Sequence, residues 1–275
     1  MKTIIVPTDF SPVAINAMHY AANMASSIGA SVILFHAYQV PVAFSEVPVV
    51  TISMEEMKKI SDEKLAEMKR SLEHLTSGKV KVYAENRLGE TVDELETLCK
   101  SINPFAIVMG TRGASAVERL FLGSNTLSAI KHLAYPVIIV PPGATYHPIR
   151  KIGFACDFRQ VVETTPVNFI HDLCNMFNSE LLVLNVDYKN KNFNSDVPEQ
   201  SLLLHNMLEK LNPSYHFIEN PNIEEGIHAF AETHAIDLII TIPKKHKLLD
   251  GIFQKSHTRE LAFHAHIPIV AIHEG

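Results

Sequence analysis

The chain has 275 residues, 47% of them hydrophobic and 20% charged, which predicts one large or two ordinary domains with a real core. This composition excludes a wholly disordered protein, and no apolar run reaches the ~18 residues of a membrane-spanning helix. The formal charge of -6 argues against nucleic acid as a partner, because there is no basic excess to neutralise phosphates.

The N-terminus and the cysteines bear on location. Asp9 comes too early for the apolar region of a signal peptide. The three cysteines, Cys99, Cys156 and Cys174, are odd in number and form no CxxC pair, which fits reduced, buried thiols. We therefore expect a cytoplasmic protein.

Strand and helix signals alternate through the first half of the chain. Ser11 and Pro12 predict the start of a helix that Gly29 ends. Ser53 and Thr91 each open a capping box, predicting helices to about Leu75 and to Lys100. A last helix is expected to end near residue 134, and strands are expected at 3–7, 31–38, 80–85, 105–109 and 136–141. This alternation predicts a parallel sheet with helices on both faces.

The pattern restarts after a proline- and glycine-rich break at 141–145. The run 151–158 repeats the pattern of 3–10, including the Asp-Phe pair, and 179–186, 237–241 and 266–272 repeat the second, fourth and fifth strands. An internal duplication follows, with domains at 1–143 and 151–275 and a linker at 144–150. Each domain should be an open, doubly wound sheet.

The chemistry is expected in the glycine-bearing loop after the fourth strand. Gly110 and Gly113 have no side chain to keep a ligand from the backbone. Gly123 and Ser124 open the next helix, whose free amides and positive dipole end favour an anion, and the hydroxyls of Ser124 and Thr126 add donors. A phosphate site is one interpretation; tight turns alone are the other, and Arg112 either pairs with a phosphate or lies in solvent. The spacing is neither Walker A nor GxGxxG.

The spacing G-x2-G-x9-G-S after a fourth strand, together with the opening Val-Pro-Thr-Asp-Phe-Ser, resembles the universal stress protein family. The whole chain is similar to its tandem, two-domain form. The resemblance implies two Rossmann-like (adenine nucleotide alpha hydrolase-like) domains, each a five-stranded parallel sheet in the order 3-2-1-4-5. It also implies that ATP or ADP, with or without Mg2+, lies across the ends of strands one and four.

Site residues follow from the same resemblance. It places the first-strand loop beside the adenosine, with the Asp9 carboxylate as an acceptor, and the backbone of Ala37 at the adenine edge. The implied nucleotide-binding residues are Pro7, Thr8, Asp9, Ala37, Met109, Gly110, Arg112, Gly113, Gly123, Ser124, Asn125 and Thr126.

The second half departs from this pattern. Aligning Pro268 with Pro136 puts Ile242, Lys245 and Lys255 where Gly110, Gly113 and Gly123 stand, and only Ser256 matches, opposite Ser124. We expect a degenerate partner domain. The basic run 244–247 is a solvated loop or a site for another anion.

The other motifs are weaker evidence of function. The fifteen histidines show no structural zinc spacing with a second pair. Cys99 and Cys174 are expected in the core, and Met54, Met57, Leu65 and Met68 are expected to form a buried helix stripe or a lid face.

Three functions remain open. The first is a nucleotide-binding regulatory or protective protein of the stress response. The second is an assembly module that needs no nucleotide. The third is an ATP-hydrolysing enzyme, for which Glu118 is the acid nearest the phosphate end.

As for partners, no membrane is expected. The family commonly pairs through fifth strands, so the two halves should form an intramolecular pseudo-dimer through 137–140 and 269–272, while a homodimer of the whole chain stays open.

Overall fold

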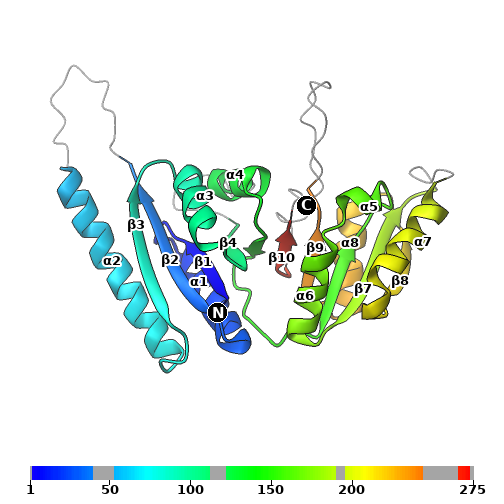
Figure 1. Cartoon of the computed structure of the whole chain (residues 1–275), viewed down its shortest axis with the longest axis horizontal. Helices are drawn as coiled ribbons and strands as arrows, with labels where there is room; N and C mark the ends of the chain where they lie inside the picture. The colour runs from blue at the N-terminus through cyan, green and yellow to red at the C-terminus, as the bar shows by residue number, and fades with distance from the viewer. Residues whose placement is uncertain (1, 40–52, 112–121, 190–195, 244–265, 273–275) are drawn as a thin grey trace, which may run out of the picture.

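The computed structural model describes residues 2–39, 53–111, 122–189, 196–243 and 266–272. Figure 1 shows two similar α/β halves side by side, joined near the centre of the molecule. The elements of the N-terminal half are β1 (Thr3–Pro7), α1 (Pro12–Ile28), β2 (Ser31–Tyr38), α2 (Met54–Leu75), β3 (Val82–Leu88), α3 (Thr91–Ile102), β4 (Ala106–Gly110), α4 (Ser124–His132) and β5 (Val137–Val140). Those of the C-terminal half are β6 (Lys151–Ala155), α5 (Val161–Thr164), α6 (Val167–Phe177), β7 (Glu180–Asp187), α7 (Val197–Leu208), the 3-10 turn η1 (Glu209–Leu211), β8 (Ser214–Glu219), α8 (Ile223–Thr233), β9 (Leu238–Thr241) and β10 (Ile269–Ala271).

The strands form one ten-stranded sheet in the order β3-β2-β1-β4-β5-β10-β9-β6-β7-β8. Within each half all neighbouring strands are parallel, and each half has the expected order 3-2-1-4-5 counted along its own strands. The two sheets expected from the sequence are thus continuous rather than separate.

The junction between the halves is the pairing of β5 with β10. These strands are antiparallel, with Val270 opposite Ile138 and Ile269 opposite Ile139. The predicted pairing of the two fifth strands is confirmed. It closes two edges that would otherwise present unpaired backbone groups.

Two apolar cores cover the two faces of the sheet, because successive strand residues point to opposite faces. Ile4 and Val6 belong to the core under α1, α2, α5, α6 and α7, whereas Ile5 belongs to the core under α3, α4 and α8. Both cores run through both halves. The sheet is therefore buried on both faces, as expected for parallel strands joined by helices.

Helix ends follow the sequence signals with one exception. Ser11 caps α1 by accepting the Ala14 amide, Gly29 ends it at a positive φ of 66°, and Ser53 accepts the Glu56 amide at the start of α2. The expected capping box at Thr91 is wrong. Thr91 lies inside the first turn of α3, and the N-cap is Glu90, whose side chain makes no capping bond.

The connection between the halves is held against α1. The Asn16 side-chain amide donates to the carbonyls of Pro141 (3.2 Å) and Ala144 (3.3 Å). The Tyr146 ring packs edge-on against Tyr20 with centroids 5.4 Å apart. These contacts fix the path of residues 141–150, although the domain boundaries themselves stay a prediction.

The buried positions expected on helices are only partly as predicted. Cys99 and Cys174 are buried in the cores, and burial raises the pKa of the Cys174 thiol to about 11, whereas Cys156 is half-buried. On α2, Leu65 and Met68 are buried, but Met54 is 49% exposed. The predicted stripe on α2 is therefore wrong at its N-terminal end, where Met54 lies in the first turn of the helix.

Candidate functional site

The carboxyl ends of β1, β2 and β4 meet at one edge of the N-terminal half, because β1 is paired in parallel with both other strands. Pro7 lies opposite Phe35 on β2, and the Thr8 amide donates to the Phe35 carbonyl at 2.8 Å. Ala37 follows on β2 and is half-buried. Met109 and Gly110 end β4. Of the expected site residues, those of β1, β2 and β4 are thus brought to one edge, where open α/β sheets bind ligands.

The loop after β1 has a fixed shape. The Phe10 amide donates to Thr8 Oγ1 (3.0 Å), and the Ser11 amide donates to Asp9 Oδ1 (3.0 Å). Phe10 has a positive φ of 66°, a conformation that non-glycine residues seldom adopt. The two side-chain bonds compensate for that backbone conformation, so Asp9 is held in a single orientation at the end of β1.

His36 completes this loop and was missed by the sequence reasoning. Its Nδ1 lies 2.7 Å from the Thr8 carbonyl oxygen, to which it must donate, and its ring lies 4.5 Å from that of Phe10. The Phe10 ring also contacts α2, because Lys64 Nζ lies 5.1 Å from its centroid. No local motif marks His36; only its place in a strand beside β1 could have suggested it.

The pKa of His36 is lowered from the ordinary value of 6.5, chiefly because burial disfavours the charged ring. The Thr8 carbonyl and Asp9 act in the opposite direction, and Lys64 adds to the lowering. The unfolded chain therefore binds a proton at His36 more readily than the folded chain does. Stability from this residue is complete above the unfolded pKa and declines as the pH falls from about 6.5 through the folded pKa.

We expect His36→Asn to reduce the loss of stability at acidic pH. The matched residue of the other half, Asn185, donates its side-chain amide to the Cys156 carbonyl at 2.8 Å, so asparagine can keep the equivalent hydrogen bond without titrating. Stability at pH 7.5 should change by about 1 kcal/mol or less. As the pH falls below about 6.5, the parent should lose stability faster than the variant, by at most about 1.4 kcal/mol per pH unit. Urea titrations across this range test it, and parallel pH profiles would contradict it.

The other side of the site is the start of α4. The Gly123 amide donates to the Thr111 carbonyl (2.7 Å), and the Leu127 amide donates to the Gly123 carbonyl (2.9 Å). Ser124 and Asn125 are exposed, and Gly123 makes no side-chain cap. The expected residues 123–126 therefore form the open first turn of a nine-residue helix directly after β4 in the fold.

Two expected site residues, Gly110 and Thr126, are engaged within the protein. A Cβ on Gly110 would lie 2.6 Å from Val13 Cγ1 and 3.0 Å from the Val13 carbonyl oxygen, so the close packing of α1 itself requires a glycine here. Thr126 is buried, and its hydroxyl donates to the Gly110 carbonyl at 2.9 Å. The Thr126 hydroxyl thus ties α4 to β4 and is not the additional donor expected from the sequence.

Thr111 is a further residue that the sequence reasoning did not single out. It is 3% exposed, and its hydroxyl has no hydrogen-bond partner among the residues that the structure describes. Buried hydroxyls without a partner are uncommon, and this one lies between Gly110 and the loop. Arg112 and Gly113, like Glu118, lie outside the described residues.

The C-terminal half repeats the first-strand loop but not, in its sequence, the glycine loop. The Phe158 amide donates to Cys156 Sγ (3.3 Å) and the Arg159 amide to Asp157 Oδ1 (3.1 Å), as Phe10 and Ser11 do in the first half. Phe158 also has a positive φ of 52°. Ile242 is half-buried against the core, while Lys245, Lys255, Ser256 and the run 244–247 lie outside the described residues.

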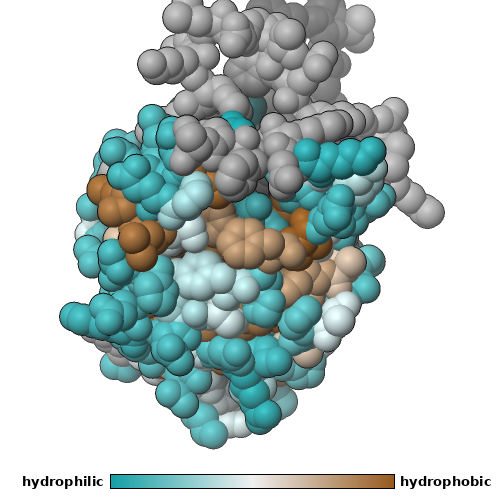
Figure 2. All heavy atoms as spheres, turned by 90° about the vertical axis from the view of Figure 1, so that its right-hand side faces the viewer, coloured by the Kyte–Doolittle hydropathy of each residue, from teal (hydrophilic) through white to brown (hydrophobic). Residues whose placement is uncertain are grey.

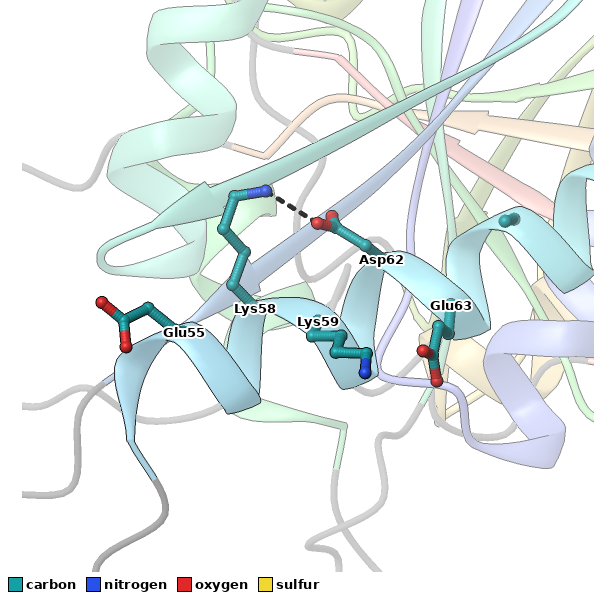
Figure 3. Close-up of a pocket in the computed structure, with 6 residues that line it drawn as sticks. Glu55, Lys58, Lys59, Asp62 and Glu63 are labelled. Atoms are coloured by element: carbon teal, nitrogen blue, oxygen red, sulfur yellow. Dashed lines mark hydrogen bonds and ion pairs between the residues drawn. The ribbon is translucent and has the colours of Figure 1, made fainter.

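A shallow hollow on α2 is a different kind of feature (Figure 3). All of its lining residues, Glu55, Lys58, Lys59, Asp62, Glu63 and Ala66, come from that one helix. Lys58 Nζ and Asp62 Oδ2 pair at 2.7 Å, which lowers the pKa of the exposed Asp62 carboxyl together with the Asn86 amide. Such a row of exposed charges is a solvated helix face, and we assign it no ligand.

In the described part of the chain, no group of three or more His, Cys, Asp or Glu side chains is arranged to hold a metal ion. None of the helices described has the length and apolar character needed to cross a bilayer.

Known proteins resemble this chain in sequence and in fold. Residues 1–141 match the model of the universal stress protein family. A universal stress protein of Methanocaldococcus jannaschii is 30% identical over 142 residues, which are 50% of this chain and 81% of that protein. The crystal structure of a universal stress protein from Archaeoglobus fulgidus has a TM-score of 0.74 at 15% identity and covers 99% of this chain and 98% of its own. A functionally unknown protein from Pseudomonas aeruginosa PAO1 has a TM-score of 0.62 at 10% identity, over 100% and 93% of the two chains. The last two likenesses concern the fold alone and extend it over both halves.

Proposed function

The chain belongs to the universal stress protein family, and on that premise we propose that its N-terminal half binds ATP or ADP. The bound nucleotide would set the conformation or the choice of partner of a regulatory or protective protein of the stress response. The proposal includes no hydrolysis step. It divides the chain into a nucleotide-binding domain at 1–143, a linker at 144–150 and a degenerate domain at 151–275.

The adenosine end of the ligand is assigned to the loop after β1 and to β2. Asp9 is oriented by the Ser11 amide, and a carboxylate there suits the hydroxyl and amino donors of a nucleoside. Ala37 presents backbone groups on β2, two residues beyond the Phe35 carbonyl that holds Thr8. His36, between them in the chain, holds the loop through the Thr8 carbonyl and acts as a positioning residue.

The phosphate end is assigned to the start of α4, and this observation carries the proposal. The first-turn amides of Ser124, Asn125 and Thr126 have no carbonyl partner within the helix, because the first bond inside it is made by Leu127. These amides and the positive end of the helix dipole favour an anion. The buried Thr111 hydroxyl adds a polar group at the end of the adjoining strand β4.

We expect one nucleotide site per chain. The N-terminal half keeps Gly110, Gly113 and Gly123, whereas the aligned positions of the other half are Ile242, Lys245 and Lys255. The lysines would put side chains where a ligand would approach the backbone, whereas Ile242 packs against the core. Isothermal calorimetry with ATP and with ADP should give a stoichiometry of one.

Mass spectrometry of ligand released from freshly purified chain is the companion measurement, and an adenine nucleotide is the expected species. Two equivalent sites would contradict the assignment of a degenerate second domain. No binding by calorimetry, together with no released nucleotide, would overturn the proposed function and leave the assembly module as the better interpretation.

A further inference from the structure

Strand β8 lies at the outer end of the ten-stranded sheet, and no strand pairs with its other edge among the residues described. Figure 2 looks at this end of the molecule and shows apolar side chains gathered across the middle of the face, with hydrophilic ones around them. Phe217 on β8 is 66% exposed and Leu202 on α7 is 61% exposed. A large exposed aromatic on an open strand edge marks a surface suited to pairing with another chain.

At the opposite end of the sheet, the outer strand β3 is hydrogen-bonded to side chains of a helix. On β3, the Asn86 side-chain amide donates to Ser61 Oγ and to Asp62 Oδ1 of α2, both at 2.7 Å. α2 also places Lys64 over the Phe10 ring. Figure 1 shows α2 lying along β3 at that end of the molecule.

Phe217 is the residue that corresponds to Asn86. Asn86 pairs with His36 on the neighbouring strand, and Phe217 pairs with Asn185, which makes the same hydrogen bond in its half as His36 does. Where the first half carries a polar group bonded to a helix, the second half therefore carries a bare aromatic ring. Its ring contact is Phe158, with centroids 5.8 Å apart.

The difference between Asn86 and Phe217 follows from the length of the crossover, the segment that joins the second and third strands of each half. α2 has 22 residues, whereas α7 has 12. The segments that join the second and third strands of the two halves are 39–81 and 188–213. The shorter crossover has fewer residues with which to reach the part of β8 where Phe217 lies.

The backbone of this edge has a defined direction. The Asn220 amide donates to the Asp187 carbonyl of β7 at 3.0 Å. Backbone groups alternate in direction along a strand, so those of Tyr215, Phe217 and Glu219 face the open side. α7 packs beside this edge, where the ring of His205 lies 5.7 Å from that of Tyr215, centroid to centroid. Leu202 is one helical turn from His205, and Phe217 is two strand residues from Tyr215, in the direction of the carboxyl ends of the strands.

We propose that two copies of this chain pair through β8, antiparallel and centred on Phe217. This register puts Phe217 of one copy beside Phe217 of the other, Tyr215 opposite Glu219 and His216 opposite Ile218, so no like charges are opposed. The chain already joins its own halves by the same antiparallel edge pairing at β5 and β10. Each copy contributes the same strand edge to this two-fold contact, so the contact closes at two copies.

The test is the oligomeric state of the full chain. A six-residue edge makes a small interface, so we expect a dimer with a dissociation constant of about 10–100 µM by sedimentation equilibrium. Phe217→Asp places two carboxylates across the two-fold axis and should raise that constant by about tenfold or more. Tyr83→Asp, a change of the 49% exposed aromatic on β3, is the matched control and should leave it unchanged.

A cross-link tests the register. In an antiparallel pair centred on Phe217 the two Cα atoms lie about 5.5 Å apart, within disulfide range. Phe217→Cys should give a covalent dimer under mild oxidation, and Tyr83→Cys should not. A chain that stays monomeric throughout the concentration range and forms no such cross-link overturns the proposal and leaves this face to a different kind of protein. A dimer that Phe217→Asp does not weaken also overturns it.

Discussion

Replacing Ser124 with aspartate is expected to abolish ATP binding without unfolding the protein. Ser124 is the first residue of α4 and is exposed, so its side chain can change without loss of core packing. A carboxylate in the first turn of a helix interacts favourably with the helix dipole, typically by about 0.3–1 kcal/mol. The same negative charge would stand where the phosphates are proposed to bind. We expect the affinity for ATP to fall by at least about 100-fold, or about 2.7 kcal/mol.

Calorimetric titration of the variant measures the affinity, and thermal melts by circular dichroism measure the fold. Asn222→Asp is the matched control, because Asn222 caps α8 in the other half by accepting the Glu225 amide. It puts the same charge at a helix start that the proposal does not use, so binding should be unchanged. A folded Ser124→Asp variant that binds ATP as the parent does would show that the phosphates lie elsewhere.

The sequence is most informative where local chemistry decides the structure. β1 and β2 have the predicted bounds, because each is a short apolar run ended by a turn or proline signal. The order of strands is not a local property, and the family resemblance supplied it. Thr91 is misplaced because a capping-box pattern can begin one residue late, when Glu90 already has the extended backbone of an N-cap.

The second half was harder to read, for a physical reason. Its third strand, β8, has half-buried and exposed positions with no buried run, so it gives neither the apolar block of a central strand nor a clear turn signal. The helix after β6 is interrupted at Thr165 and Pro166, where α1 is continuous. Such breaks do not disturb the fold, because the packed positions of β6, β7 and β9 are kept.

The candidate site was likewise only partly predictable from the sequence. The candidates at the start of α4 were found from residue types and spacing, and those of the β1 loop from the family resemblance. The structure brings the carboxyl ends of β1, β2 and β4 together. What the sequence could not reveal is which polar groups are already engaged. Thr126 is used within the protein by Gly110, and His36 by Thr8, and each bond joins residues distant in the chain. Spacing identifies candidate donors, but only the packing decides which of them remain for a ligand.

Val270→Asp should be the most destabilising of the substitutions considered, because Val270 holds the two halves together. It is 0% exposed, and it pairs with Ile138 on the antiparallel side and Ile240 on the parallel side. An aspartate there would be taken out of water among aliphatic side chains. It would either remain charged without a partner or take up a proton at the cost of a raised pKa. We expect a loss of more than about 4 kcal/mol in the free energy of unfolding.

Urea denaturation followed by circular dichroism measures this loss. Tyr83→Asp, on the exposed edge, should cost about 0.5 kcal/mol or less, because its carboxylate stays hydrated. If Val270→Asp does not fold at all, Val270→Ala keeps the experiment informative, since removing buried methyl groups should still cost about 1–3 kcal/mol. Should the alanine and aspartate variants both be as stable as Tyr83→Asp, β10 would not lie between β5 and β9 in solution. The continuous sheet, and with it the pairing that closes the two central edges, depends on that placement.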